Sequence, residues 1–161
     1  MITQEELKRL LHYNPETGFF TWLVTNTNKV KVGSVAGTRN PEAYCQITVA
    51  GGRYLAHRLV WLYVHGRWPT EMLDHKNLNR QDNRLENLRE ATRSENLSNS
   101  KCRSHSKIGV KGVCKNGGRW MARITVGGES TYLGTFDTIE EAHQAFMAAA
   151  RAQRGEFARA A

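Results

Sequence analysis

The first hundred residues carry helix patterns on both sides of a strand-rich stretch. Leu7, Leu10 and Leu11 recur at helical spacing and predict a helix over residues 4–11. Residues 57–65 are apolar on nearly every side of a helical projection, which predicts a buried helix at the centre of this half. Aromatic and β-branched residues between them predict short strands, the last two joined as a hairpin, at residues 19–22, 44–49 and 53–55.

After residue 108 the pattern changes to strands punctuated by glycine pairs. Three stretches predict the strands of an antiparallel sheet with hairpin turns between them: residues 109–113, 119–126 and 130–136. A capping box from Thr138 to Glu141 predicts a helix that runs to about Arg154. The apolar stripe of this helix contains several alanines, so we expect the helix to lie close against one face of the sheet. The predicted fold class of the whole chain is α+β.

A basic, serine-containing stretch at residues 101–107 shows no apolar periodicity and predicts a boundary between two domains, residues 1–103 and 104–161. The chain carries 23 Lys and Arg against 15 Asp and Glu, a formal charge of +8. There are 13 basic and 10 acidic side chains up to residue 100, and 10 basic and 5 acidic side chains beyond it. Both domains are therefore basic, and we expect both to contact a polyanionic partner.

Composition excludes several classes of protein. The three cysteines, Cys45, Cys102 and Cys114, are odd in number and widely spaced, so neither a disulfide framework nor a cysteine zinc site is expected. No apolar run approaches the roughly 20 residues that a membrane span needs. The first ten residues are polar and acidic rather than basic and then apolar, so we expect an intracellular protein that is not secreted.

The densest polar signal lies at residues 73–96, which hold an Asp-His pair and five asparagines. Asn and Asp are common in turns, so composition alone favours a turn-rich loop. The flanking pattern changes that interpretation, because residues 72–75 and 87–91 predict strands and a capping box from Thr92 to Glu95 predicts a helix. A strand, loop, strand and helix with acid, imidazole and amide groups at the junctions can support one hard metal ion.

This stretch resembles the ββα-metal motif of HNH endonucleases, also called His-Me finger nucleases. It is most similar to the phage and intron-encoded branch, in which a helix that begins His57-Arg58-Leu59 precedes the motif. The resemblance covers residues 53–99 and rests on features at matching spacing: Asp74-His75, Asn83, Asn87-Leu88-Arg89 and Asn96. Where many relatives have Asp-Gly in the loop, this chain has Asn77-Leu78.

The resemblance implies a role for each of four residues. His75 is the general base, Asn87 positions it, and Asp74 and Asn96 hold a divalent metal ion. A neutral imidazole that titrates near pH 6.5 suits the first role. Carboxylate and amide oxygens favour Mg²⁺ or Mn²⁺ over zinc. Neighbouring strand residues point to opposite faces, so Asp74 and His75 share a site only if they flank the metal from the end of the strand.

The second domain resembles the Apetala-type, ethylene-responsive-factor DNA-binding domain over residues 109–157. Gly112-Val113, the strand 120–124 and Tyr132-Leu-Gly-Thr-Phe-Asp137 carry the resemblance, together with Glu140-Glu-Ala142 and Gly155-Glu-Phe157. Met121, Arg123 and Thr125 alternate with apolar residues, which leaves a polar face that is either simply solvated or reads DNA. The residues expected to contact DNA are Lys111, Lys115, Arg119, Arg123, Thr125 and Tyr132 in this domain, and Arg89 and Arg93 in the first. Plant members differ at Cys114, Ser130 and Tyr132, so their sequence preference does not carry over.

The resulting hypothesis is a metal-dependent DNA endonuclease of the phage or homing type that binds double-stranded DNA, with an HNH domain followed by a three-stranded sheet packed on one helix. One centre cuts one strand, so a monomer is expected to nick, and a dimer is left open. If phage-encoded, the protein acts in the cytoplasm of a bacterial host. The alternative is a non-catalytic DNA-binding regulator built on the HNH fold. An RNA-binding module fits less well, because the open sheet lacks paired aromatics that stack bases. Target sequence, metal identity and biological role, whether homing, packaging or degradation of host DNA, stay open.

Overall fold

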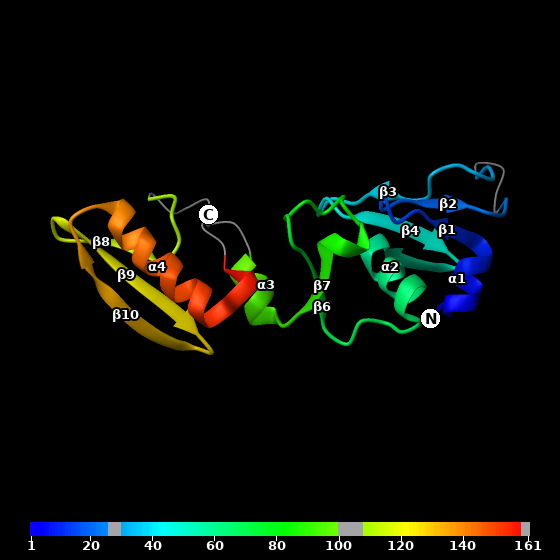
Figure 1. Cartoon of the computed structure of the whole chain (residues 1–161). Coiled ribbons are helices and arrows are strands. Elements are labelled where there is room, and N and C mark those ends of the chain that lie inside the picture. The colour runs from blue at the N-terminus through cyan, green and yellow to red at the C-terminus, as the bar shows by residue number, and fades with distance from the viewer. Residues whose placement is uncertain (26–29, 100–107, 159–161) are drawn as a thin grey trace. The chain divides into compact units, whose positions relative to one another are not determined.

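The computed structural model describes residues 1–25, 30–99 and 108–158, and it divides into two compact units, Met1–Ala91 and Thr92–Ala161 (Figure 1). The domain boundary predicted at residues 103 and 104 lies outside the described residues, as does Cys102, and it stays a prediction. Among the described residues, no helix is long and apolar enough to cross a membrane.

The first unit opens with helix α1 (Gln4–Leu10), which begins where Thr3 Oγ1 accepts a hydrogen bond from the Glu6 N–H. Strand β1 (Leu11–Tyr13) follows without a break and pairs antiparallel with β2 (Phe20–Trp22). The helix ends one residue before its predicted end, because Leu11 already has extended backbone angles. Strand β1 was not predicted, since three residues are too few to establish an alternating pattern.

A three-stranded antiparallel sheet in the order β3-β4-β5 comes next, from β3 (Thr38–Arg39), β4 (Cys45–Val49) and β5 (Gly52–Leu55). Helix α2 (Ala56–His65) follows directly and ends at Gly66, whose φ of 71° is the left-handed conformation that glycine adopts without steric cost. Both the hairpin and the buried helix therefore form at the predicted positions.

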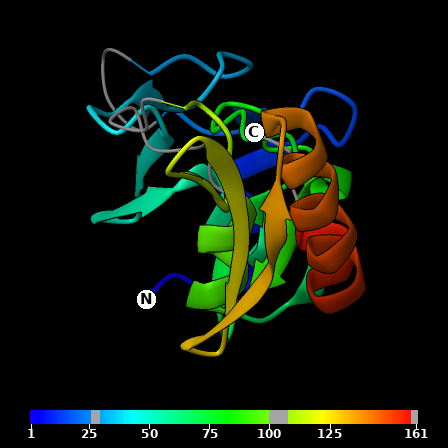
Figure 2. The same cartoon turned by 90° about the vertical axis from the view of Figure 1, so that its left-hand side faces the viewer.

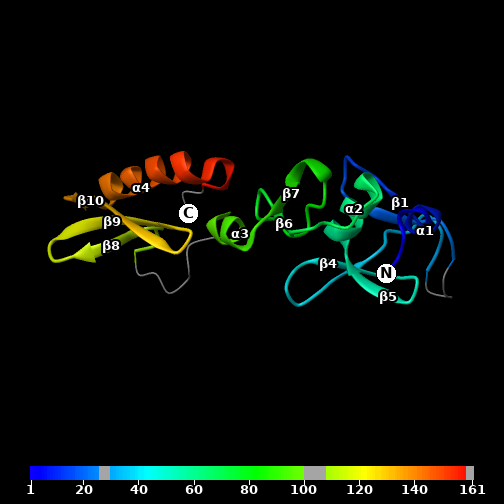
Figure 3. The ribbon, with the colours of Figure 1, turned by 90° about the horizontal axis from the view of Figure 1, so that it is seen from below.

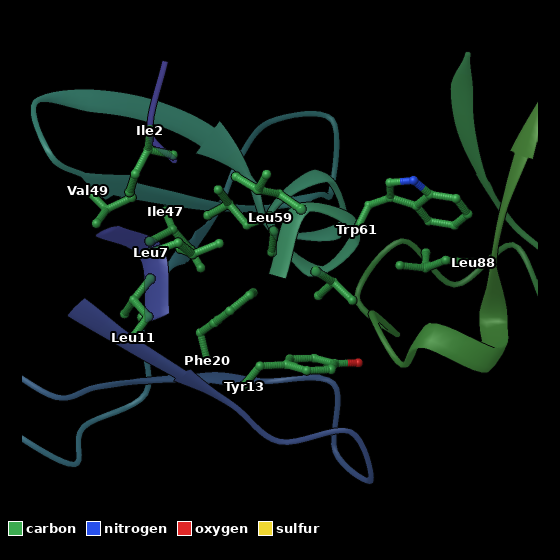
Figure 4. Packing of buried hydrophobic residues seen from close by; sticks show 14 of the residues in the cluster. Ile2, Leu7, Leu11, Tyr13, Phe20, Ile47, Val49, Leu59, Trp61 and Leu88 are labelled. Carbon is green, nitrogen blue, oxygen red and sulfur yellow. The ribbon is translucent and has the colours of Figure 1, made fainter. Parts of the chain in front are cut away.

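The core of the first unit gathers apolar side chains from α1, β1, β2, β4 and α2, with Leu88 on a later strand (Figure 4). Leu7, Leu11 and Leu59 are fully buried within it. Truncating a buried leucine to alanine removes packing that cannot be replaced, at a cost of about 2–5 kcal/mol. This core fixes α2, and α2 in turn supports the hairpin that carries the polar motif.

That hairpin consists of β6 (Met72–His75) and β7 (Leu88–Ala91), which pair antiparallel, with a 3₁₀ turn, η1 (Leu85–Asn87), immediately before β7. The register runs from Met72 opposite Ala91 to His75 opposite Leu88 without a shift. The two strands thus bring the Asp-His pair next to residues 88 and 89, and the loop between them carries the asparagines.

The second unit contains α3 (Arg93–Asn99), a three-stranded antiparallel sheet and a long helix. The sheet has the order β10-β9-β8, formed by β8 (Val113–Asn116), β9 (Arg119–Val126) and β10 (Glu129–Phe136). Helix α4 (Ile139–Arg154) lies along one face of this sheet and is followed by a 3₁₀ turn, η2 (Gly155–Phe157) (Figures 2 and 3). The capping box at Thr138 and Glu141 is present, as the sequence predicts.

Close packing explains both the helix position and one wrong prediction. Ala142, Phe146 and Ala150 are buried on α4 and face the sheet. The first strand was predicted at residues 109–113, but it begins at Val113, because Gly112 has a φ of 69° and ends the extended run. A Cβ at Gly112 would lie 2.0 Å from Phe146 Cδ2, so only glycine fits beneath the helix.

Candidate active site

His75 is the last residue of β6 and is buried, with 4 % of its surface exposed. Its Nε2 lies 3.3 Å from Oδ1 of Asn83, which is itself 1 % exposed. The imidazole also contacts the ring of His57 from α2, edge to face at 5.1 Å, and the ring of Tyr44 at 5.9 Å between centroids. The ring plane of His75 is therefore fixed by one amide and two neighbouring rings.

Burial determines the protonation of both imidazoles. It lowers the pKa of His75 below its ordinary value, against a smaller opposite effect of the Asn83 hydrogen bond. It lowers the pKa of His57 to about 3, and the neighbouring His75 acts in the same direction. At neutral pH both rings are uncharged, and an uncharged imidazole can accept a proton from water.

Asn87 holds the loop that follows His75. Its Oδ1 accepts a hydrogen bond from the Asn77 N–H at 3.0 Å, and its Nδ2 donates to the Asp82 carbonyl at 2.8 Å. The amide oxygen that lies 3.3 Å from His75 Nε2 belongs to Asn83. The Asn87 amide is engaged by loop backbone at both ends, and its predicted role in positioning His75 stays a prediction.

The loop itself is built from side-chain hydrogen bonds to backbone. Asn77 Oδ1 accepts from the Asn79 N–H, and Asn79 Oδ1 accepts from the Gln81 N–H, both of which are local turn motifs. Leu78 adopts a φ of 60°, a conformation that favours glycine. The departure from the Asp-Gly of many relatives therefore falls on a position where the backbone is strained.

Asp74 forms a buried ion pair with Arg89 across the hairpin. Its Oδ2 accepts hydrogen bonds from Arg89 Nε at 3.0 Å and Nη2 at 2.9 Å, and the two residues are 4 % and 8 % exposed. Arg89 is thus buried against a carboxylate in this structure, and its contact with DNA stays a prediction. The unbroken register places Asp74 and His75 on opposite faces of β6.

The expected metal ligands lie in different units. Asp74 belongs to the first, and Asn96 to the second, where its N–H donates to the Thr92 carbonyl in the first turn of α3. The capping box predicted at Thr92 and Glu95 is present. Within the described part of the chain, no three His, Cys, Asp or Glu side chains form a cluster suited to a metal ion. Carboxylate and amide oxygens are the donors that a hard divalent ion accepts, and the joint role of Asp74 and Asn96 as metal ligands stays a prediction.

The face of the second sheet opposite α4 carries Arg123 and Thr125, with Tyr132 paired to Arg123, and all three are exposed. Lys115 is paired with Trp120, so its side chain leaves the sheet on the α4 side rather than on this open face. Lys115 and Arg123 thus lie on different faces of the sheet, and contact of Lys115 with DNA stays a prediction.

Three further residues were predicted to contact DNA: Arg119, Lys111 and Arg93. Arg119 shares the strand face of Arg123, but its Nε donates to Asp137 Oδ1 at 2.7 Å, which offsets its charge. Lys111 lies before β8 and is partly buried, and Arg93 is exposed on α3. Their contact with DNA stays a prediction.

Sequence reasoning gave no role to Tyr44 and did not connect His57 with His75. Tyr44 lies between β3 and β4, thirty-one residues before His75 in the chain. Its proximity to the imidazole depends on tertiary packing, so no local pattern signals it. Asn83 was among the residues that carry the resemblance, but spacing alone did not show that it contacts His75.

Comparison with known proteins finds a family match over a defined segment of the chain. Residues 54–98 match the family model described as HNH endonuclease, a segment that includes His57, Asp74, His75 and both hairpin strands. A solved structure reported under "DNA binding and cleavage by the HNH homing endonuclease I-HmuI" aligns with 23% sequence identity and a TM-score of 0.42, covering 56% of this chain and 51% of that one. The alignment thus spans about half the length of that protein. No curated protein sequence matches significantly. Residues 54–98 of this chain are therefore similar in sequence to HNH endonucleases.

Proposed function

We propose that this chain is a metal-dependent endonuclease that hydrolyses phosphodiester bonds of DNA. The observation that carries the proposal is the buried, uncharged His75, held by Asn83 inside the segment that matches HNH endonucleases. The name under which the similar solved structure is reported describes DNA binding and cleavage by that protein, which is the kind of activity proposed here.

His75 acts as the general base in this proposal. It accepts a proton from the water that attacks phosphorus, and its neutral form is the one that can do so. Asn83 and the ring of His57 keep the imidazole plane fixed, so little reorganisation is needed when the proton moves. A positioned base of this kind contributes about 10²–10⁴ in rate.

Asp74 and Asn96 are the residues that would hold the divalent ion, Mg²⁺ or Mn²⁺. When bound, such an ion supplies Lewis-acid stabilisation of the charge that develops on the phosphate oxygens. Arg89 has a supporting part, because its two hydrogen bonds to Asp74 Oδ2 orient the carboxylate. Breaking this pair would leave a buried charge without a partner.

In this proposal the second unit binds duplex DNA. Arg123, Thr125 and Tyr132 lie exposed on the sheet face that α4 does not cover. Arg side chains can contact both phosphates and guanine edges in the major groove. Because a centre of this kind cuts one strand at a time, a single copy is expected to nick.

The proposal is tested with supercoiled plasmids of several sequences and a random duplex library, each with Mg²⁺, Mn²⁺ or EDTA. We expect relaxed circles and cleaved library members in metal and intact DNA in EDTA. DNA that stays intact with every metal, while the protein binds duplex in a salt-sensitive way, would instead support a non-catalytic DNA-binding regulator.

A further inference from the structure

The loop between β6 and β7 carries Arg80, which forms no ion pair with any of the residues that the structure describes. Arg84 in the same loop forms ion pairs with Asp82 at 2.7 Å and Glu86 at 3.0 Å. Arg80 is exposed, and its Nη1 donates to the backbone carbonyl of Glu42 at 2.8 Å. No carboxylate lies within ion-pair distance of Arg80 in the part of the chain that the structure describes. Its positive charge is therefore available to an anion from outside the protein.

Arg80 is also held in place. Its guanidinium carbon lies 4.7 Å from the centroid of the Tyr44 ring, a cation–π distance. The next residue, Gln81, donates from Nε2 to the Ala43 carbonyl, which ties the loop to the turn before β4. Asn40 fixes that turn, since its Oδ1 accepts from the Tyr44 N–H at 2.8 Å. An arginine with this support loses little side-chain freedom on binding a ligand.

The same tyrosine reaches the proposed general base. The Tyr44 ring lies 5.9 Å from the His75 ring and 5.2 Å from the His57 ring. One face of contact thus joins the three groups, because Tyr44 lies against both the Arg80 guanidinium and the His75 imidazole. An anion that binds Arg80 therefore lies beside the site where His75 would act.

We infer that Arg80 binds a phosphodiester oxygen at or next to the bond that is cut, with Tyr44 as its platform. A guanidinium matches phosphate geometry because it can donate two parallel N–H groups. Because Nη1 already donates to the Glu42 carbonyl, Nε and Nη2 are the nitrogens that would donate to the phosphate. The inference rests on the proposed function for the identity of the bound strand, and it names a substrate contact that the sequence did not suggest.

Duplex binding measured in EDTA over a range of salt concentrations tests this contact without cleavage. Arg80→Ala should weaken binding about tenfold and reduce the slope of log K against log salt by about 0.9, the value of one phosphate contact. Arg80→Lys should keep the slope and lose part of the affinity, because it retains the charge without the fork. The matched control is Lys8→Ala, which removes a cation stacked on Tyr63 at 5.2 Å.

The control should change affinity less than twofold. If Arg80→Ala behaves like Lys8→Ala in both affinity and salt slope, with both variants folded by circular dichroism, the inference is wrong, even if the protein cleaves DNA. If Arg80→Ala shows the predicted loss while the unmodified protein cleaves no DNA with any metal, Arg80 contacts phosphate and the proposed endonuclease activity is wrong.

Discussion

At the scale of single residues, the motif names the polar residues of the hairpin, but it does not show which of them are hydrogen-bonded to one another. Asp74, His75 and Asn83 were all identified through the resemblance to HNH endonucleases, and the structure brings His75 and Asn83 together in the first unit. Asn83 contacts the imidazole, while Asn87 bonds to the loop backbone at both ends of its amide. Arg89 pairs with Asp74, since the hairpin register sets these two residues opposite one another. Register is a tertiary property that a list of residue types does not contain.

Leu78 gives a prediction about local strain. Its φ of 60° is unfavourable for a side chain with a Cβ, so Leu78→Gly should raise the free energy of unfolding by about 0.5–1 kcal/mol. Denaturant titration measures the change. Ala50→Gly, at a φ of 48° in the exposed turn between β4 and β5, is the matched control and should stabilise by a similar amount. A clear loss of stability in Leu78→Gly alone would mean that the leucine side chain has a packing role that outweighs the strain.

His57 gives a prediction about acid stability. Its pKa is about 3 in the folded protein and near 6.5 when unfolded, so below pH 6.5 the unfolded chain takes up a proton that the folded chain does not. Stability should therefore fall as the pH is lowered from 6.5, by up to about 1.4 kcal/mol per pH unit from this residue. His57→Gln should flatten the curve between pH 6.5 and 4.5.

Between pH 6.5 and 4.5 the change in stability comes from histidine and not from the carboxylates with lowered pKa values. The pKa values of Asp82 and Glu90 are lowered to about 2 by hydrogen bonds from Arg84 and Arg67, so their contribution is lost only below about pH 4.5. His12→Gln, at an exposed position, is the control and should leave the curve unchanged. Equal slopes for unmodified protein and His57→Gln would contradict the buried, uncharged state of His57.

At the scale of elements, long periodic segments were predictable and short or glycine-limited ones were not. Helix α2 and the capped helix α4 form where apolar periodicity and the capping box place them. Strand β1 has three residues, too few to show a period. Strand β8 begins later than predicted, because Gly112 has a positive φ and packs against Phe146 of α4 instead of extending the strand. The sequence shows that a glycine is present, but only the packing shows why.

Gly112 carries the prediction at this scale. Gly112→Ala places a Cβ 2.0 Å from Phe146 Cδ2 and 2.8 Å from the Arg123 carbonyl oxygen, so α4 must shift from the sheet. We expect a loss of about 2–4 kcal/mol in unfolding free energy. Gly117→Ala has a similar positive φ but no neighbour within 4 Å, and it should cost only about 1 kcal/mol. Equal losses in thermal or denaturant melts would show that backbone strain, not the contact with α4, determines the effect.

At the scale of the whole molecule, basic charge is spread over both units, and folding determines which charges are available. Arg84 and Arg89 are neutralised by carboxylates, whereas Arg80 and Arg123 are exposed without an ion pair among the described residues. Net charge indicated a polyanionic partner, but it did not distinguish these cases. The family match covers the hairpin and α2, so the role of the second unit rests on the character of its open sheet face.

A comparison of substitutions at Arg123 and Lys115 tests whether the open sheet face binds DNA. Both are exposed cations on neighbouring strands, but Arg123 lies on the open face and Lys115 on the α4 side. Arg123→Ala should weaken duplex binding about tenfold and lower the salt slope by about 0.9, while Lys115→Ala should have a much smaller effect. Fluorescence anisotropy with labelled duplex measures both. Equal effects, or a larger effect of Lys115→Ala, would exclude the open face as the docking surface.

The most direct test of the endonuclease account is the rate of plasmid nicking by His75→Ala beside the unmodified protein, with Mn²⁺ and saturating enzyme. His75 is buried at the end of β6 with Asn83 at its Nε2, so removing it should slow nicking by about 10²–10⁴ while duplex affinity stays unchanged. His12→Ala should nick at the normal rate. Equal nicking by His75→Ala and the unmodified protein would contradict the account, because the base would then lie elsewhere.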